Sequence, residues 1–254
     1  QFAIMATTGK PIFDEEGRAS WFSHKTETAQ PHYYKVYLAD YDTTVEITPT
    51  NRAAQFRFTF PETDKAYLLL DAFFKGSKVQ VLPQERKIIG YARNNSGGVP
   101  ENFHNYFVIT FDKDFESVQT WGNGYKLSNK PESEGEHTGA VIGFRTKKGE
   151  QITAKVASSF ISPAQALLNL QTELGNDTFE QTQQKALALW EAELGKIQVE
   201  DENIDHLRTF YSCLYRTLLF PRTFYEYNKT GEMVHYSPYN GKIEKGYMFT
   251  DNGF

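Results

Sequence analysis

Aromatic and planar polar residues gather most densely near the carboxyl end of the chain. Tyr236, Tyr239 and Asn240 lie in this stretch, and Asp251 and Phe254 follow close to the last position. Aromatic rings stack on the apolar faces of sugar rings, and amide and carboxylate groups exchange several hydrogen bonds with hydroxyls. The composition is that of a carbohydrate site, although an ordinary packed loop has the same residue types.

Two charged residues flank a short aromatic run upstream of that stretch. Arg222 and Glu226 lie on either side of "TFY". The simpler interpretation is an ion pair between them that shapes the loop. The functional alternative is that the Arg222 guanidinium donates a hydrogen bond to a sugar hydroxyl.

A second polar cluster lies near the amino end, with the members Trp21, His24, Lys25, Glu27 and His32. Two histidines with a carboxylate between them are residue types that ligate transition metals. Contact with a substrate is another interpretation. The favoured interpretation is a polar loop that packs against another domain.

Several functional classes are disfavoured by the sequence. It contains no His-Glu-x-x-His, no phosphate-binding glycine loop and no Gly-x-Ser-x-Gly motif. Cys213 is the only cysteine, so no intramolecular disulfide and no cysteine-based zinc site is expected. The formal net charge of −5 argues against non-specific nucleic-acid binding. No apolar run is long enough to span a membrane.

The elements that must position these residues differ between the two parts of the chain. Up to about residue 159 the sequence reads as some ten short strands separated by turns, for example Phe56, Phe58 and Phe60 alternating with Gln55 and Arg57. Such a period of two predicts strands with one face toward the core and one toward solvent. Many short strands with few helices between them indicate an antiparallel sandwich.

Helical patterns follow the strands. Ser162 and Pro163 predict the start of one helix, and Asp177 with Glu180 predicts a capping-box start for a second. A third helix carries a strong apolar stripe, formed by Ile204, Leu207, Tyr211, Leu214 and Leu218. We therefore predict a β-sandwich over residues 1–159, a helical linker over 160–200, and the start of a helical domain over 201–254.

The sequence is expected to be a piece of a longer one. Its first residues, "QFAIM", already read as a buried strand, and the apolar stripe of the third helix needs partners that the following residues do not supply. Without those partners we expect the isolated span to aggregate or to exchange elements between copies.

Two long segments of the sequence resemble glycoside hydrolase family 92. They are "TGKPIFDEEGRASWFSHKTETAQPHYYKVYL" and "FYSCLYRTLLFPRTFYEYNKTGEMVHYSPYNGKIEKGYMFTDNGF". Members of that family are bacterial exo-acting α-mannosidases, many of them specific for α-1,2 linkages. The resemblance implies an antiparallel β-supersandwich, linker helices and an (α/α)6 barrel that packs on the sandwich, of which this chain holds only the beginning.

The resemblance also implies a calcium-dependent, inverting enzyme outside the cytoplasm, periplasmic or secreted, with a mannose-containing glycan as substrate. It places the catalytic acid, the catalytic base and the calcium ligands outside this chain, so no residue of the chain is assigned a catalytic or metal-ligating role. It suggests Asp251, Asn252 and Phe254 at the edge of the sugar pocket, and we add Arg222 as a substrate-binding residue. The alternative is a sandwich that binds carbohydrate or braces a partner domain without doing chemistry.

Overall fold

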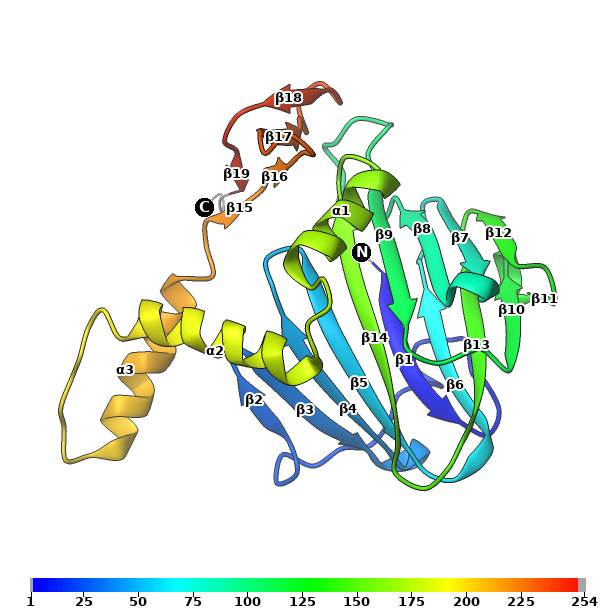
Figure 1. Cartoon of the computed structure of the whole chain (residues 1–254), viewed down its shortest axis with the longest axis horizontal. Coiled ribbons are helices and arrows are strands. Elements are labelled where there is room, and N and C mark those ends of the chain that lie inside the picture. Colours follow the sequence, from blue (N-terminus) through cyan, green and yellow to red (C-terminus); the bar gives the residue numbers. More distant parts are fainter. Residues whose placement is uncertain (1, 251–254) are drawn as a thin grey trace.

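The computed structural model describes residues 2–250, and two antiparallel sheets dominate it. A nine-stranded sheet packs face to face on a five-stranded sheet, and three helices follow the sandwich (Figure 1). The prediction of a mainly β fold, an antiparallel sandwich followed by helices, is confirmed. The boundaries of the three predicted domains stay a prediction.

Each of the two sheets has its own strand order across the sandwich. In spatial order, the nine-stranded sheet contains β12 (Glu132–Gly135), β7 (Ser77–Leu82), β8 (Lys87–Ala92), β9 (Asn105–Phe111), β14 (Glu150–Ser159), β5 (Ala53–Phe60), β4 (Thr43–Pro49), β3 (Tyr33–Leu38) and β2 (Thr28–Gln30). The five-stranded sheet contains β1 (Ala3–Thr8), β6 (Thr63–Asp71), β13 (Gly139–Thr146), β10 (Ser117–Trp121) and β11 (Leu127–Ser128). Three short 3-10 helices lie in the connections, at Ala39–Tyr41, Pro83–Glu85 and Asn123–Tyr125.

The core between the sheets is built from alternate residues of the strands, as the period of two requires. Phe58 and Phe60 of β5 meet Leu68 and Leu70 of β6 and Ile109 of β9 in one buried cluster. The opposite face of β5 differs from the prediction. Gln55 was expected to face solvent, but it is fully buried and its Nε2 donates to Thr182 Oγ1 at 2.7 Å. A helix therefore covers this face of the sheet.

The covering helices are α1 (Pro163–Glu173) and α2 (Phe179–Leu194). Ser162 caps α1 as predicted, because its Oγ accepts a hydrogen bond from the Gln165 backbone N at 3.1 Å. The cap of α2 is not the predicted Asp177. Thr178 and Gln181 form the capping box instead, since Thr178 Oγ1 accepts from the Gln181 backbone N at 3.2 Å and Gln181 Oε1 accepts from the Thr178 backbone N at 2.9 Å.

A charged cluster fixes the start of α2 to the sheet. Arg57 of β5 donates through Nε and Nη2 to the two oxygens of Glu46 on β4, both at 2.8 Å. It also pairs with Glu180, and its guanidinium lies 4.2 Å from the ring centroid of Phe179. The predicted alternation is thus present in β5, but its polar side chains hold a helix in place.

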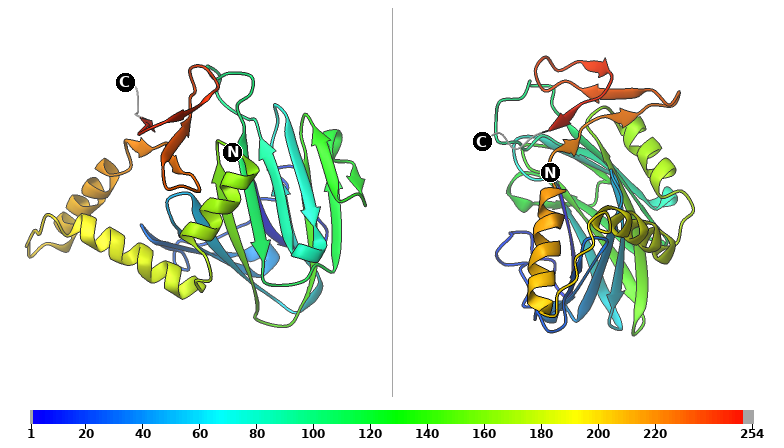
Figure 2. Two further views of the ribbon diagram at one scale, coloured as in Figure 1. Left: turned by 45° about the horizontal axis from the view of Figure 1, so that its top comes forward. Right: turned by 90° about the vertical axis from the view of Figure 1, so that its left-hand side faces the viewer.

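Helix α3 (Ile204–Thr217) follows, and no residue of it is buried. Figures 1 and 2 show α2 leading away from the sandwich, with α3 at its far end. Five short strands come next: β15 (Arg222–Thr223), β16 (Glu226–Tyr227), β17 (Met233–Tyr236), β18 (Ile243–Lys245) and β19 (Phe249–Thr250). β16, β17 and β18 form one sheet, and β15 pairs with β19. No helix among the described residues is long and apolar enough to cross a membrane.

Candidate functional site

A buried carboxylate joins the sandwich, the first helix and the carboxyl-terminal strands. Glu226 of β16 is only 3% exposed. Its Oε1 accepts hydrogen bonds from Ser159 Oγ and the Phe160 backbone N, both at 3.0 Å, and its Oε2 accepts from Asn169 Nδ2 at 2.7 Å. The donors come from the end of β14, the residue after it, and α1. Glu226 therefore lies where three parts of the chain meet.

The surroundings of Glu226 suit a structural group better than a catalytic one. Burial raises the pKa of Glu226, although its three hydrogen bonds act in the opposite direction. A raised pKa is what a general acid needs. However, the cavity beside it has a volume of about 110 Å³, and small-molecule sites usually enclose roughly 300–1,000 Å³. A sugar ring does not fit there, so we assign Glu226 to holding the fold together.

The predicted ion pair between Arg222 and Glu226 is wrong. Within residues 2–250 the Arg222 guanidinium lies 4.6 Å from the ring centroid of Phe220, and its Nε donates to the Leu219 carbonyl at 3.4 Å. Arg222 is exposed, while Glu226 is turned into the protein. The reason is that three uncharged donors, on Ser159, Phe160 and Asn169, already hydrogen-bond to the buried Glu226 carboxylate. The exposed Arg222 guanidinium, which was expected to bind this carboxylate, is not needed there.

The ladder between β15 and β19 brings Arg222 next to the end of the described chain. Arg222 lies opposite Thr250, and Thr223 lies opposite Phe249. The other proposed substrate-binding residues, Asp251, Asn252 and Phe254, lie outside the described residues. Their place in a sugar pocket, and that of Arg222, stays a prediction.

A row of aromatic rings that the sequence did not reveal follows this ladder. Tyr225 lies 5.2 Å from Tyr247 and 5.5 Å from Tyr227, and Tyr247 lies 5.8 Å from Phe249, measured between ring centroids. Tyr227, Tyr247 and Phe249 are about half exposed. The Arg52 guanidinium lies 5.4 Å from the Tyr225 ring centroid. Tyr225 and Tyr247 are far apart in the sequence, and the pairing of β15 with β19 brings them together. The aromatic row could therefore not be predicted without knowing this pairing.

The earlier part of the predicted carbohydrate stretch is divided between core and surface. Tyr236 is 3% exposed, and its hydroxyl donates to Asn102 Oδ1 at 3.1 Å. Tyr239 is 89% exposed, and Asn240 Nδ2 donates to Glu244 Oε1 at 2.7 Å. Tyr236 is therefore a packed residue, and its assignment to an open sugar site is corrected.

The amino-terminal cluster is likewise split. His24 Nδ1 lies 2.5 Å from Glu27 Oε2, and Tyr34 Oη donates to Glu27 Oε1 at 2.6 Å. These hydrogen bonds, Tyr34 first and His24 second, lower the pKa of Glu27. His32 is buried and Trp21 is 80% exposed. Nowhere in residues 2–250 do three His, Cys, Asp or Glu side chains come together to hold a metal ion.

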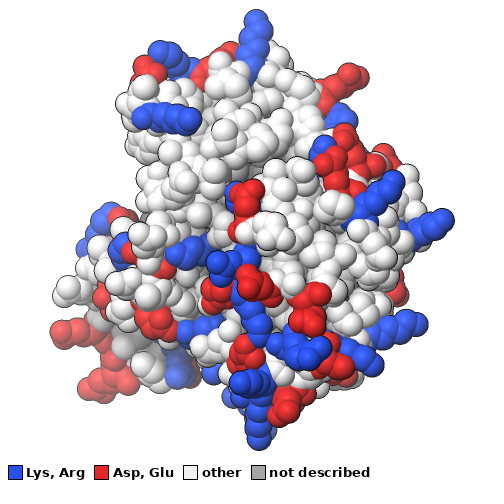
Figure 3. Space-filling model, turned by 45° about the vertical axis from the view of Figure 1, so that its right-hand side comes forward, with Lys and Arg blue, Asp and Glu red and all other residues white. Residues whose placement is uncertain are grey.

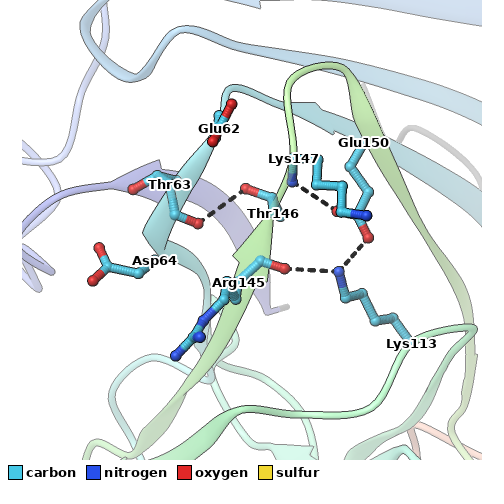
Figure 4. A pocket seen from close by; sticks show the side chains of 8 residues that line it. All are labelled: Glu62, Thr63, Asp64, Lys113, Arg145, Thr146, Lys147 and Glu150. Carbon is cyan, nitrogen blue, oxygen red and sulfur yellow. Dashed lines mark hydrogen bonds and ion pairs between the residues drawn. The ribbon is translucent and has the colours of Figure 1, made fainter.

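An open hollow of about 610 Å³ lies at the turns that join β5 to β6 and β13 to β14 (Figure 4). Its wall contains three acidic and three basic residues. Glu150 is paired with Lys113 and accepts from the Lys147 backbone N at 2.8 Å. The Lys113 hydrogen bond, followed by that from Lys147, lowers the pKa of Glu150, so this carboxylate stays ionised and does not suit a general acid. Acidic and basic side chains also intermix over the surface drawn in Figure 3.

Comparisons with known proteins decide the family. Residues 1–159 match the glycosyl hydrolase family 92 N-terminal domain, and residues 165–254 match the glycosyl hydrolase family 92 catalytic domain. The chain belongs to glycoside hydrolase family 92. No curated protein matches it in sequence.

Solved structures of family 92 enzymes superimpose closely on the chain. The family 92 inverting mannosidase BT2199 of Bacteroides thetaiotaomicron is 40% identical to it, with a TM-score of 0.95 over 99% of the chain. The family 92 α-mannosidase BT3965 of the same organism is 31% identical, with a TM-score of 0.84 over 98% of the chain, and it has also been solved in complex with mannoimidazole. The chain spans about a third of these proteins, 34% and 35% respectively.

Family membership assigns the helices and the last strands to the beginning of the catalytic domain. The predicted architecture, a family 92 sandwich followed by the start of a helical barrel, is confirmed by the match to the catalytic domain and by the solved relatives. Glu226, Arg222 and the aromatic row therefore all lie in the part of the chain that matches the catalytic domain of family 92.

Proposed function

We propose that this chain is part of an exo-acting α-mannosidase that removes terminal α-1,2-linked mannose from glycans with inversion of configuration. The observation that carries the proposal is the superposition of nearly the whole chain, at 40% identity, on an inverting mannosidase of family 92. The mannoimidazole complex of a second relative supports a mannose-like group as the ligand.

Inversion needs two carboxyl groups about 6.5–9.5 Å apart, one to protonate the leaving oxygen and one to activate water. Within the described residues, Glu226 is the carboxyl whose pKa is raised, and it is enclosed. Glu27, Glu134 and Glu150 have a lowered pKa because hydrogen bonds stabilise their charge. We therefore assign the catalytic pair to a part of the enzyme that this chain does not include.

We also propose that the enzyme depends on calcium, as the family resemblance implies. Calcium takes six to eight oxygen ligands. The described residues do not fit such a site, because no three acidic or histidine side chains converge among them. The calcium ligands, like the catalytic pair, belong in our proposal to the remainder of the enzyme.

In this proposal the chain positions the sugar and supports the barrel. Glu226 fixes the carboxyl-terminal strands to the sandwich, and the β15–β19 ladder presents Arg222 beside the segment that leads to Asp251. Arg222 then donates a charge-assisted hydrogen bond to a hydroxyl of the bound mannose. Asp251, Asn252 and Phe254 line the edge of the same pocket.

The test is hydrolysis of α-1,2-mannobiose by the intact parent enzyme. Proton NMR should show β-mannose as the first product, and a calcium chelator should abolish the release. First-formed α-mannose would refute inversion, and activity that resists the chelator would refute the calcium requirement. The 254-residue chain alone should release no mannose, and release by it would refute our assignment of the carboxylates elsewhere.

The place of action is proposed to be outside the cytoplasm. Cell fractionation of the native organism, with immunoblotting for the enzyme, tests this directly. Recovery with the periplasm or the culture medium supports export, whereas recovery with the cytosol contradicts it.

A further inference from the structure

A small cavity lies where the sandwich meets the first strands after the helices. Its volume is about 110 Å³. Its walls come from the turn between β4 and β5, the end of β14, and the strands β15 and β16. Arg52 belongs to the first of these wall segments and Glu226 to the last. Residues of this chain alone thus form the cavity, and it does not depend on the rest of the enzyme.

The guanidinium of Arg52 is incompletely paired. Its side chain is only 14% exposed, and its Nη1 lies 3.7 Å from Glu173 Oε1 of α1, which is longer than a hydrogen bond. Its Nη2 is buried and has no hydrogen-bond partner within residues 2–250. A buried charged donor without an acceptor is costly, so native proteins nearly always supply one. Because this chain already buries Nη2, the acceptor has to be small enough to lie in the cavity.

Several contacts hold Arg52 in this position. Its carbonyl accepts a hydrogen bond from the Ser158 backbone N at 3.0 Å, and its own backbone N donates to Glu173 Oε2 at 2.8 Å. Its guanidinium lies 5.4 Å from the ring centroid of Tyr225, the residue before Glu226. A rotation of the side chain into solvent would give up the contacts with Glu173 and Tyr225. The guanidinium is therefore expected to stay at the cavity.

Glu226 is the acidic residue in the cavity wall, and one of its acceptor sites is free for a further bond. Its Oε1 accepts two hydrogen bonds, whereas its Oε2 accepts one, from Asn169 Nδ2. Each carboxylate oxygen has two lone pairs, so Oε2 can accept another. Burial raises the pKa of Glu226, and its hydrogen bonds, followed by the charge of Arg52, act in the opposite direction. Arg52 Nη2 does not reach this carboxylate directly, since it has no partner within the described residues.

The charges of the two side chains select the kind of molecule that the cavity can hold. An anion would be repelled by Glu226, and a cation would be repelled by Arg52. A neutral molecule that both donates and accepts hydrogen bonds satisfies both groups. Water needs about 10–15 Å³ and two to four polar partners. The cavity, of about 110 Å³, provides the space, and Arg52 and Glu226 provide two partners.

We propose that at least one ordered water occupies this cavity and joins Arg52 to Glu226 in a water-mediated ion pair. The water accepts a hydrogen bond from Arg52 Nη2 and donates one to Glu226 Oε2. Arg52 lies in the part of the chain that matches the N-terminal domain of family 92, and Glu226 lies in the part that matches its catalytic domain. The bridge adds a charged connection between the two domains, and it does not depend on which reaction the enzyme catalyses.

A crystal structure of the intact enzyme, at a resolution that shows ordered waters, tests the proposal directly. We expect a water whose oxygen lies about 2.7–3.2 Å from both Arg52 Nη2 and Glu226 Oε2. A side chain from the remainder of the enzyme in the cavity would overturn the proposal. So would a direct hydrogen bond between Arg52 and Glu226, or a cavity without water. The measurement needs no variant, so it stands even if a substitution prevents folding.

A double-mutant cycle on the intact enzyme gives a second test. Arg52→Met and Glu226→Gln should each lower the Tm, and the double variant should lose about 1 °C or more less than the sum of the two losses. The contacts of Arg52 with Glu173 and Tyr225 are lost in both arms of the cycle and cancel. Arg86→Met is the matched control, because Arg86 pairs with Asp114 at an exposed site, and its loss should add to that of Glu226→Gln. Additive losses for Arg52→Met and Glu226→Gln would refute the bridge.

Discussion

Arg222 and Thr250 face each other in the β15–β19 ladder, although a complete three-stranded sheet lies between them in the sequence. The pairing sets Arg222 beside the chain immediately before Asp251. Two parts of the proposed sugar pocket thus depend on one short backbone ladder.

Replacing Arg222 with alanine in the intact enzyme should lower kcat/KM for α-1,2-mannobiose by roughly 10- to 100-fold. The reason is that a hydrogen bond from a charged group to a neutral one is worth about 1.5–3 kcal/mol. Steady-state kinetics measure the effect. Arg86→Ala, which removes an exposed arginine at the far end of the sandwich, should leave kcat/KM unchanged. Equal kcat/KM values for the two variants would show that Arg222 does not bind the substrate.

Replacing Glu226 with alanine should destabilise the chain by about 3 kcal/mol or more. The substitution leaves three donors, on Ser159, Phe160 and Asn169, without their acceptor in a buried position. Urea denaturation followed by circular dichroism measures the change in the free energy of unfolding. A loss below about 1 kcal/mol would show that these donors find other acceptors.

The Glu226→Gln variant tests the pKa of the same carboxyl. Because burial raises the pKa of Glu226 above its ordinary value of 4.5, the folded chain binds the proton more tightly than the unfolded chain. The free energy of unfolding of the unchanged chain, relative to that of Glu226→Gln, should therefore fall as pH rises from about 4.5 through the raised pKa. A difference that grows with pH would contradict the raised pKa.

Replacing Arg57 with methionine should cost about 3 kcal/mol at neutral pH, because it leaves the buried carboxylate of Glu46 without its ion-pair partner. Burial alone would raise the pKa of Glu46, but hydrogen bonds from Arg57 and Tyr33 outweigh it and lower the pKa. This stabilisation is present above pH 4.5 and is lost as pH falls through the lowered pKa. The cost of the substitution should therefore shrink in acid. Arg145→Met breaks the exposed pair with Glu116 and should cost less than about 1 kcal/mol.

Replacing Gly139 with alanine should destabilise the sandwich by about 2–3 kcal/mol. A Cβ at Gly139 would lie 2.0 Å from Trp121 Cζ2 and 2.3 Å from the Leu70 carbonyl oxygen, and Trp121 is fully buried. Gly122→Ala is the control, because its Cβ would lie no closer than 3.4 Å to Ser133 Oγ and its φ is −118°. Thermal unfolding should show a lower Tm for the first variant, and equal Tm values would contradict the clash.

The sequence predicted the fold where local patterns determine it. Ser162 caps its helix as expected, and Phe58 and Phe60 face the core as their alternation predicts, because alternation and capping act within a few residues. The burial of Gln55 was not predictable in this way, since it depends on the position of α2 over the sheet. The choice of Asp177 over Thr178 was an error of another kind, because the two are neighbours and both are good caps.

The candidate site was less predictable, because contacts between distant segments build it. Arg222 lies four residues before Glu226 in sequence, yet the carboxylate is bound by Ser159 and Asn169 from other elements. Tyr225 and Tyr247 lie 5.2 Å apart, measured between ring centroids, although the strands β16 to β18 separate them in the sequence. The residue types near the carboxyl end suggested a carbohydrate site, and only the resemblance to family 92 pointed to mannose.

The hydrogen bonds of Glu226 also bear on how the enzyme moves. A hinge between the sandwich and the catalytic domain would have to part Glu226 from Ser159 and Phe160, and so break two hydrogen bonds of a buried carboxylate. We therefore expect crystals grown with and without a mannose analogue to show the same angle between the domains. Substrate would then enter and product would leave through an aperture of constant width, so that glycan bulk, not domain closure, would select what is cleaved.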